Sequence, residues 1–325
     1  ISNPDYGQLV YEGRDEDMVP CIRCNKCHGR GQGDPFASVC SVNPILGLEH
    51  HISNMVRDPS PSKRIAVIGG GPGGMRAALY LSDRGHSVTI FEKSDGLGGA
   101  IRHADFVSFK WPLKRYKDWL IAQVGKRPIQ VRLQTLATPE QIQSEGFDVV
   151  LAAVGADPVR PPIPGADGPN ICFATDILCD HTRAGHRVVV IGGGEVGTET
   201  GMHLAEHGHE VTVLEMRDTL AADTTKIHYR SMFQAYWESL PGFHFLLSAT
   251  CTSIQDGSVS YQDSNGTAHT LEADTVVLSA GMRAKRDEAL AYYGACGRFY
   301  MVGDCRKPAT LQQTNRSAFA VASQI

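Results

Sequence analysis

The chain contains an internal repeat whose two copies align without a gap. Residues 65–92 read IAVIGGGPGGMRAALYLSDRGHSVTIFE, and residues 188–215 read VVVIGGGEVGTETGMHLAEHGHEVTVLE. Each copy has a β-branched run, a G-x-G-x-x-G turn, a helical stretch, and a second β-branched run that ends in glutamate. This order is typical of a strand–turn–helix–strand unit with parallel strands. The repeat therefore predicts an α/β chain with two such units.

The glycines and the acid of each copy have separate physical tasks. The first glycine permits the tight turn, the second lets a pyrophosphate approach the backbone, and the third lets the helix pack on the strand. The helix N-terminus attracts phosphate, and the carboxylate accepts hydrogen bonds from ribose hydroxyls. We therefore predict two dinucleotide sites, formed by Gly69, Gly71, Gly74 and Glu92 and by Gly192, Gly194, Gly197 and Glu215.

The residues after each glutamate suggest which dinucleotide binds where. Glu92 is followed by K-S-D-G-L-G-G-A, in which Gly98 and Gly99 allow the backbone to approach the phosphates and ribitol of a flavin. The second copy has M-R-D-T-L-A-A-D instead, so we assign FAD to the first copy and NAD(H) to the second. Glu215 favours NADH because a carboxylate there repels a 2′-phosphate, and Arg217 leaves NADPH as the less favoured alternative.

Four cysteines near the start form a second motif, C-I-R-C-N-K-C-(x12)-C, with the thiols of Cys21, Cys24, Cys27 and Cys40. Four thiolates can hold one [4Fe–4S] cluster. Structural zinc is the main alternative, although zinc sites usually pair their cysteines two and two. Buried free thiols are the third interpretation. The pattern favours the iron–sulfur cluster and so indicates electron transfer.

Composition limits the remaining classes. The chain has 325 residues, enough for two or three domains, and its net charge of −4 indicates neither a nucleic-acid nor a membrane partner. The first twenty residues lack an apolar run, so no secretory signal is expected. Nine cysteines without such a signal favour a reducing, cytoplasmic compartment. The thirteen histidines show no metal-ligand spacing.

The order of motifs predicts a fold class of two Rossmann-like three-layer domains, one inserted into the other. The segments are a cluster segment and linker at 1–61, an FAD domain at 62–157 and 275–325, and an NAD(H) domain at 158–274. We expect buried strands within 149–156, 275–281 and 299–305, and a closing helix. We also expect an amphipathic helix over 109–120, with Leu113, Tyr116 and Leu120 facing inward and the lysines in water.

The cluster loop ending in C-S-V-N-P, the two glycine turns and the final V-G-D-C-R-K-P together resemble the iron–sulfur flavoenzymes of the 2,4-dienoyl-CoA reductase, 2-enoate reductase and trimethylamine dehydrogenase group. The similarity covers nearly the whole chain and is greatest to NADH-dependent enoate reductases of anaerobes. It implies that electrons pass from NADH through FAD and the cluster to an FMN, and then to an activated C=C bond. It also implies that the four cysteines are cluster ligands and that Gly303 and Asp304 join Gly98 and Gly99 at FAD.

Two features depart from the family pattern. The spacing between Cys24 and Cys27 is that of the amine dehydrogenase branch, whereas the intact second nucleotide motif argues for a reductase. The family carries FMN and substrate on a (β/α)8 barrel of ~250 residues, and only twenty residues precede Cys21. The resemblance therefore implies that the barrel is an N-terminal part outside this sequence or a separate subunit. An amine or N-methyl dehydrogenase and a stand-alone electron-transfer subunit are the alternatives. Catalytic residues, the small-molecule substrate and homo-oligomer formation stay open.

Overall fold

The computed structural model describes residues 1–28, 39–52, 56, 61–222 and 227–325. Contacts divide the chain into two compact units, of which the first is discontinuous in sequence. The first unit comprises Ile1–Ala104, Phe109–Asp157 and Arg283–Ile325, and the second comprises Asp105–Ser108 and Pro158–Met282. A two-stranded sheet of β5 (Ala156–Pro158) and β14 (Met282–Ala284) lies where the chain passes between them.

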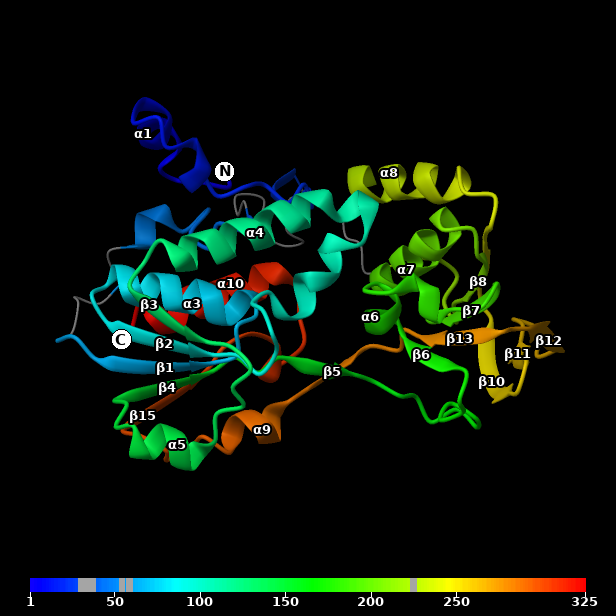
Figure 1. Ribbon diagram of the computed structural model, residues 1–325. Coiled ribbons are helices and arrows are strands. Elements are labelled where there is room, and N and C mark those ends of the chain that lie inside the picture. The colour runs from blue at the N-terminus through cyan, green and yellow to red at the C-terminus, as the bar shows by residue number, and fades with distance from the viewer. Residues whose placement is uncertain (29–38, 53–55, 57–60, 223–226) are drawn as a thin grey trace. The chain divides into compact units, whose positions relative to one another are not determined.

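The first unit is built on a parallel sheet with the strand order β15-β4-β1-β2-β3 (Figure 1). Its strands are β1 (Arg64–Ile68), β2 (Ser87–Phe91), β3 (Ile129–Arg132), β4 (Val149–Ala152) and β15 (Arg298–Met301). All four neighbouring pairs are parallel. Because parallel sheets are covered on both faces, the strands are nearly continuous apolar runs.

Alternating side chains of β1 enter two cores, as the two-residue period of a strand requires. Ile65 and Val67 face a core with residues of α3 (Pro72–Asp83), α4 (Trp111–Gly125) and α10 (Leu311–Ala322). Ala66 and Ile68 face a second core that includes Ile142 of α5 (Pro139–Ser144). Figure 1 shows the same layers, with α3, α4 and α10 on one side of the sheet and α5 on the other. The remaining helix here is α9 (Arg286–Leu290).

Helix α4 confirms the amphipathic helix expected from the sequence. Tyr116 and Leu120 are fully buried, and Leu113 packs against the same core. Lys117 differs from the expectation that the lysines face water, because its side chain is buried and its amine lies 3.1 Å from the carboxylate of Asp118. The aliphatic part of a lysine can pack in this way while its charge remains paired.

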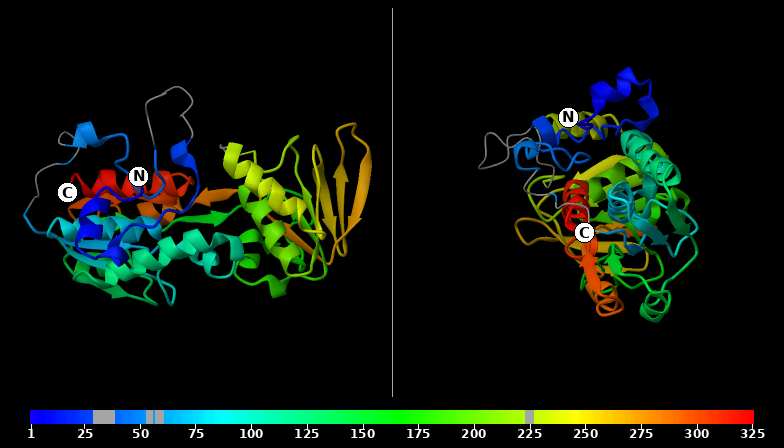
Figure 2. Two further views of the ribbon diagram at one scale, coloured as in Figure 1. Left: turned by 90° about the horizontal axis from the view of Figure 1, so that it is seen from above. Right: turned by 90° about the vertical axis from the view of Figure 1, so that its left-hand side faces the viewer.

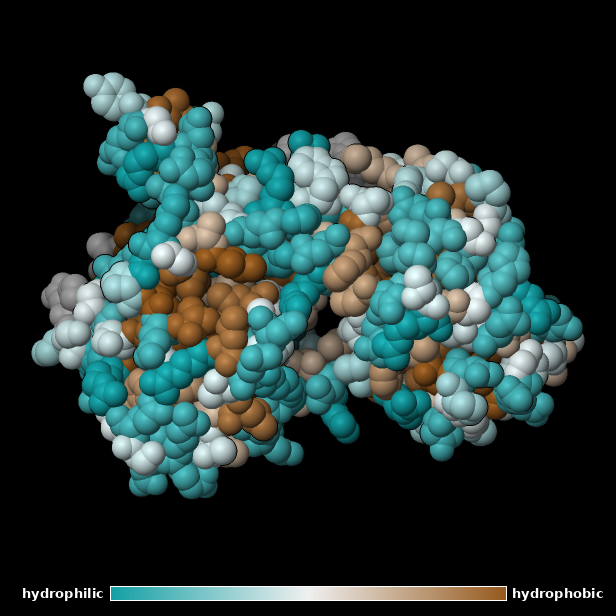
Figure 3. Space-filling model, viewed as in Figure 1, coloured by the Kyte–Doolittle hydropathy of each residue, from teal (hydrophilic) through white to brown (hydrophobic). Residues whose placement is uncertain are grey.

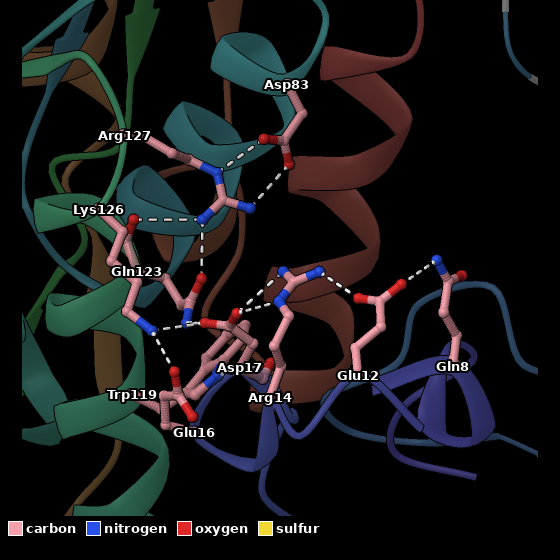
Figure 4. Close-up of polar contacts among 10 residues, drawn as sticks. All are labelled: Gln8, Glu12, Arg14, Glu16, Asp17, Asp83, Trp119, Gln123, Lys126 and Arg127. Carbon is pink, nitrogen blue, oxygen red and sulfur yellow. Dashed lines mark hydrogen bonds and ion pairs between the residues drawn. The ribbon is translucent and has the colours of Figure 1, made fainter. Parts of the chain in front are cut away.

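The N-terminal segment contains α1 (Tyr6–Tyr11) and docks on α4 through a carboxylate (Figure 4). Asp17 accepts hydrogen bonds from Lys126 at 2.6 Å and from Gln123 at 2.9 Å. Arg14 bonds to the other carboxylate oxygen of Asp17 at 2.9 Å. The hydrogen bond from Lys126, followed by those from Gln123 and Arg14, holds the pKa of Asp17 well below its usual range. The segment that leads to the cysteines is therefore fixed to the first unit.

The second unit repeats the first sheet, with the order β6-β13-β7-β8-β9. Its strands are β6 (Ile171–Phe173), β7 (Arg187–Ile191), β8 (Glu210–Leu214), β9 (Phe243–Leu246) and β13 (Thr275–Leu278), all parallel. Its helices are α6 (Ala174–Ile177), α7 (Glu195–Glu206) and α8 (Ile227–Glu238). The sequence repeat thus folds as β1–α3–β2 and β7–α7–β8, which confirms an α/β fold with two parallel sheets.

A three-stranded antiparallel sheet adds to the second unit. It consists of β10 (Thr250–Gln255), β11 (Ser258–Gln262) and β12 (Ala268–Glu272), drawn in yellow to orange in Figure 2. Val259 and Ile254 pack with Val189 and Leu278 of the parallel sheet in one core. Strand β13 pairs with β6 and β7, so the second unit ends at Met282 rather than before residue 275.

Short 3-10 helices connect these elements. They are η1 (Asp15–Asp17), η2 (Lys26–His28), η3 (Glu49–His51), η4 (Gly99–Asp105), η5 (Ser108–Lys110), η6 (His181–Arg183) and η7 (Gly303–Cys305).

The face drawn in Figure 3 is mostly hydrophilic, with a hydrophobic area over the first unit. Among the described residues, no helix combines the length and the apolarity that crossing a bilayer requires.

Candidate functional site

The glycine turn of the first unit accepts no side chain at its first and third glycines. Gly69 has φ +109°, and a Cβ there would lie 2.5 Å from the carbonyl oxygen of Ala153. A Cβ on Gly74 would lie 1.9 Å from the carbonyl oxygen of Gly69. Helix α3 therefore starts in direct contact with the end of β1, which is the close packing that the sequence motif predicts.

The glycine turn of the second unit has the same close contacts as that of the first. Gly192 has φ +100°, and its Cβ would lie 2.5 Å from the carbonyl oxygen of Ser279. A Cβ on Gly197 would lie 1.8 Å from the carbonyl oxygen of Gly192. The same contacts thus recur in both units at equivalent residues.

The second glycine of each motif occupies the N-cap of the following helix. Gly71 precedes α3 and Gly194 precedes α7, and neither helix has a side-chain capping bond. The first backbone N–H groups of a helix have no partner inside the helix. A phosphate at either helix N-terminus would satisfy these groups and lie at the positive end of the helix dipole.

The two glutamates hold the glycine turns in place. Glu92 accepts a hydrogen bond from the backbone N–H of Gly70 at 2.7 Å, and Glu215 accepts one from Gly193 at 2.7 Å. The second oxygen of Glu92 accepts bonds from Ser94. Both carboxylates are buried. A carboxylate offers about four lone-pair sites, so each retains capacity for a ribose hydroxyl.

Glu215 also bonds to the arginine that the sequence raised as a determinant of cofactor preference. Arg217 donates from its backbone N–H at 2.8 Å and from Nε at 3.1 Å to one oxygen of Glu215. The Arg217 side chain is 43% exposed. The guanidinium is therefore partly neutralised by Glu215, the residue expected to select NADH.

A cavity of about 800 Å³ opens over the second glycine turn, wholly within the second unit. Its lining includes Gly192, Gly194, Glu215, Arg217 and Ser279. Small-molecule sites usually have volumes of ~300–1,000 Å³. The second turn thus lies at the floor of a space large enough for a nucleotide.

The glycine pair after Glu92 lies against the first turn. Gly98 donates a backbone hydrogen bond to the carbonyl of Gly70 at 2.9 Å. A Cβ on Gly99 would lie 2.8 Å from the Cα of Gly71. The two backbones therefore approach closely where the sequence places the flavin phosphates, and the contact leaves no room for a side chain at position 99.

Gly303 also reaches this turn, from the C-terminal part of the chain, and Asp304 follows it. Gly303 has φ +72°, and its Cα would lie 4.0 Å from a Cβ on Gly73 in the first turn of α3. Burial raises the pKa of Asp304, which accepts a hydrogen bond from the backbone of Ala309 at 3.2 Å. The structure thus brings together all the predicted FAD residues in one unit.

The four predicted cluster cysteines converge in the first unit, and Cys40 is buried. Burial raises the pKa of Cys27, and the neighbouring charges of Cys40, Cys24 and Cys21 raise it further. Arg23 and Asn25, on either side of Cys24, both have φ +55°. Such conformations are costly for residues with side chains and occur at ligand clamps. The backbone therefore turns sharply on both sides of Cys24.

A buried polar network fixes this loop to the helices of the first unit. The Cys24 Sγ and Ser41 Oγ atoms are 3.1 Å apart, and the Ser41 carbonyl accepts a bond from Asn315 at 2.6 Å. Tyr116 donates to the Asn315 side chain at 3.2 Å, and Asn315 is 0% exposed. Sequence reasoning missed Ser41, Asn315 and Tyr116 as site residues. Among the three, only Ser41 has a signal in the sequence, because it follows Cys40 directly.

Residues 63–318 match the pyridine nucleotide-disulphide oxidoreductase family, a span that includes both glycine turns. The chain belongs to this family. Members of this pyridine nucleotide-disulphide oxidoreductase family bind FAD and NAD(H), which agrees with the two turns described above.

The chain is also similar to larger flavoenzymes. It is 33% identical to an NADH oxidase of Thermoanaerobacter brockii over 100% of this chain and 50% of that protein. It is 30% identical to a cinnamate reductase of Clostridium sporogenes over 100% of this chain and 48% of that protein. A solved 2-naphthoyl-CoA reductase complex matches with a TM-score of 0.91 and 31% identity, covering 100% of this chain and 49% of that one.

These matches confirm the resemblance to the iron–sulfur flavoenzyme group. The chain is homologous to their FAD- and NAD-binding halves. It spans about half the length of the curated relatives that it matches.

Proposed function

We propose that this chain is the NADH-oxidising FAD/[4Fe–4S] module of an ene-reductase-type enzyme. The chain would bind NADH at the second unit, and electrons would pass from NADH through FAD and the cluster toward an FMN on a (β/α)8 barrel outside this sequence. The observation that carries the proposal is the cysteine loop, which Ser41 and Asn315 fix to the unit that has the first glycine turn. One unit would therefore hold both a two-electron and a one-electron carrier.

The assignment of FAD to the first unit has support from the extra glycine crossing. Gly98 and Gly99 bring a second backbone segment onto the first turn, as an extended dinucleotide requires. FAD supplies the exchange between hydride and single-electron chemistry when it is bound. The residues of this chain would bind its phosphates at Gly71 and α3 and its ribose at Glu92.

The spacing of the cysteines in the sequence supports an iron–sulfur cluster over zinc. Zinc sites usually pair their cysteines two and two, whereas here three cysteines lie close together and the fourth lies at a distance. Four thiolates can hold one [4Fe–4S] cluster, each bound to a different iron. Cys21, Cys24, Cys27 and Cys40 are the proposed ligands.

The proposed substrate class is an activated C=C bond. It rests on the names of two similar proteins, a cinnamate reductase and a 2-naphthoyl-CoA reductase, and on the shared halves. Because the chain spans about half of these proteins, the barrel with its substrate pocket is part of the proposal. The proposed cofactor preference is NADH, because Glu215 is buried beside the second turn.

Iron and acid-labile sulfide analysis of the anaerobically purified chain tests this proposal. We expect about four of each per chain, together with one FAD released on denaturation. The Cys24→Ala variant should lose iron but retain FAD, because Cys24 does not take part in the glycine turn. Zinc in place of iron would contradict the cluster assignment.

An amine or N-methyl dehydrogenase of the same group is the second candidate. The observation that favours it is the two-residue spacing between Cys24 and Cys27. Such an enzyme would deliver electrons to an external acceptor and would not react with NADH. The intact turn at Gly192, Gly194 and Gly197 and the cavity above it argue for the NADH-dependent reductase.

A further inference from the structure

Four histidine rings gather at the C-terminal end of α7 in the second unit. His203 lies in the last turn of α7, His207 caps the helix, His209 follows, and His181 comes from η6. The ring centroids of His181 and His207 are 3.9 Å apart, and those of His203 and His207 are 4.6 Å apart. The His181 ring also lies 5.7 Å from that of His203 and 5.9 Å from that of His209. The dinucleotide sites do not use these side chains.

Three of the side chains in this region present donor atoms to a common point. The ligand atoms of His203, Glu206 and His207 all lie within 4.8 Å of one another. The sequence H-x-x-E-H places these residues on one helix face, because positions three and four apart are neighbours. The expectation that the histidines show no metal-ligand spacing is therefore wrong for this group.

Hydrogen bonds orient two of the imidazoles, of which His207 belongs to the ligand group. The Nδ1 atom of His207 lies 2.8 Å from the His203 carbonyl, and that of His209 lies 2.7 Å from the Gly185 carbonyl. Since a carbonyl only accepts, each Nδ1 carries the proton and each Nε2 keeps a lone pair. The Nδ1 atom of His181 is buried and has no hydrogen-bond partner among the described residues.

Two side chains outside the ligand group donate hydrogen bonds to the Glu206 carboxylate. Glu206 accepts hydrogen bonds from the hydroxyl of Ser108 at 2.8 Å and from the phenol of Tyr236. Outer hydrogen bonds of this kind are typical of metal-ligating carboxylates. The group also lies at the C-terminus of α7, where the helix dipole favours a cation.

We propose that a Zn²⁺-class transition-metal ion binds here, with His203, Glu206 and His207 as ligands. Imidazole and carboxylate ligands suit zinc, whereas calcium and magnesium prefer oxygen alone. Zinc ligands at about 2.0–2.1 Å from the ion lie roughly 3.3 Å apart, so small side-chain rotations close the set. Because zinc has no redox chemistry, the ion would stabilise the end of α7 rather than carry electrons.

Zinc binding to the chain that carries FAD and its iron–sulfur cluster tests this site. Calorimetric titration with Zn²⁺, after treatment with a chelator mild enough to retain iron, should show one zinc ion per chain and a higher Tm. X-ray absorption at the zinc edge should show nitrogen and oxygen ligands at about 2.0–2.1 Å. Sulfur ligands at about 2.3 Å would mean that cysteines bind the ion and would overturn the proposal.

Three variants identify the ligands. His207→Ala, at an exposed position, should weaken zinc binding by more than about 100-fold, and Tyr236→Phe should weaken it by about 10–100-fold. The matched control is His269→Ala, since His269 is an exposed histidine that pairs with Asp263 at 2.9 Å, outside the group. Zinc affinity of the control should equal that of the unmodified chain. Equal affinity in His207→Ala would overturn the proposal.

Discussion

Replacing Gly197 with alanine should separate α7 from β7 at the second glycine turn. The new Cβ would lie 1.8 Å from the carbonyl oxygen of Gly192 and 3.1 Å from the Cβ of Ser279. Non-bonded heavy atoms reach their optimum at about 3.5–4.0 Å. The carbonyl belongs to the backbone and cannot rotate away, so the helix itself must move by more than about 1 Å to restore that separation.

The cost of this movement follows from overpacking. Added methyl groups in well-packed sites usually cost about 1–3 kcal/mol. If that cost falls on the nucleotide-binding geometry, NADH affinity should drop by roughly 5- to 150-fold, because 1.4 kcal/mol is tenfold. The N–H groups at the N-terminus of α7 are the ones expected to bind the phosphates of NADH. Moving the helix should therefore weaken NADH binding as well as folding.

Equilibrium titration of NADH with the Gly197→Ala variant measures this effect. FAD content should be unchanged, because the proposed FAD residues lie in the other unit. Gly74→Ala, whose Cβ would lie 1.9 Å from the Gly69 oxygen, should give the converse result of lost FAD and retained NADH binding. Gly125→Ala is the control, since a Cβ there meets nothing within 4 Å. Unchanged NADH affinity in Gly197→Ala would refute the reasoning.

Three further predictions follow from polar contacts. Ser41→Ala removes the hydroxyl beside Cys24 and should lower the reduction potential of the cluster by about 20–60 mV, the equivalent of ~0.5–1.4 kcal/mol. An EPR-monitored redox titration measures this shift, and an unchanged potential would contradict a contact between Ser41 and a ligand sulfur. Asp17→Asn should lower the free energy of unfolding by about 1 kcal/mol in urea titrations. Because Lys126 lowers the pKa of Asp17, that difference should be full above about pH 5 and shrink as the pH falls, and a difference that grows in acid would be inconsistent with the ion pair. Glu215→Gln removes the repulsion of a 2′-phosphate and should raise the ratio of NADPH to NADH affinity by about tenfold; a ratio that stays constant would assign the preference to another residue.

The repeat made much of the fold predictable from sequence. Its two copies fold as equivalent strand–helix–strand units, because the glycines leave room for one packing only. The pair Gly98–Gly99 was also predictable as a close backbone approach, although its contact with Gly71 was not specified. Motifs of this kind are predictable because all the residues that contact one another lie within one short stretch of sequence.

Other features depend on contacts between distant segments. Asn315 bonds to Ser41 across 274 positions, and nothing in either local sequence indicates the pairing. The antiparallel strands β10–β12 are short and half polar, so their sequence did not distinguish them from loops. The ligand group His203, Glu206 and His207 is local in sequence, whereas the contact of His181 with His207 joins segments 26 positions apart.

Anaerobic titration with NADH tests the central claim most directly. The measurement follows flavin absorbance and the EPR signal of the cluster in the same sample. We predict prompt bleaching of the flavin band by about one equivalent of NADH, followed by the signal of a reduced [4Fe–4S] cluster. A flavin band that NADH leaves unchanged, in a chain with full FAD and iron content, would contradict the account.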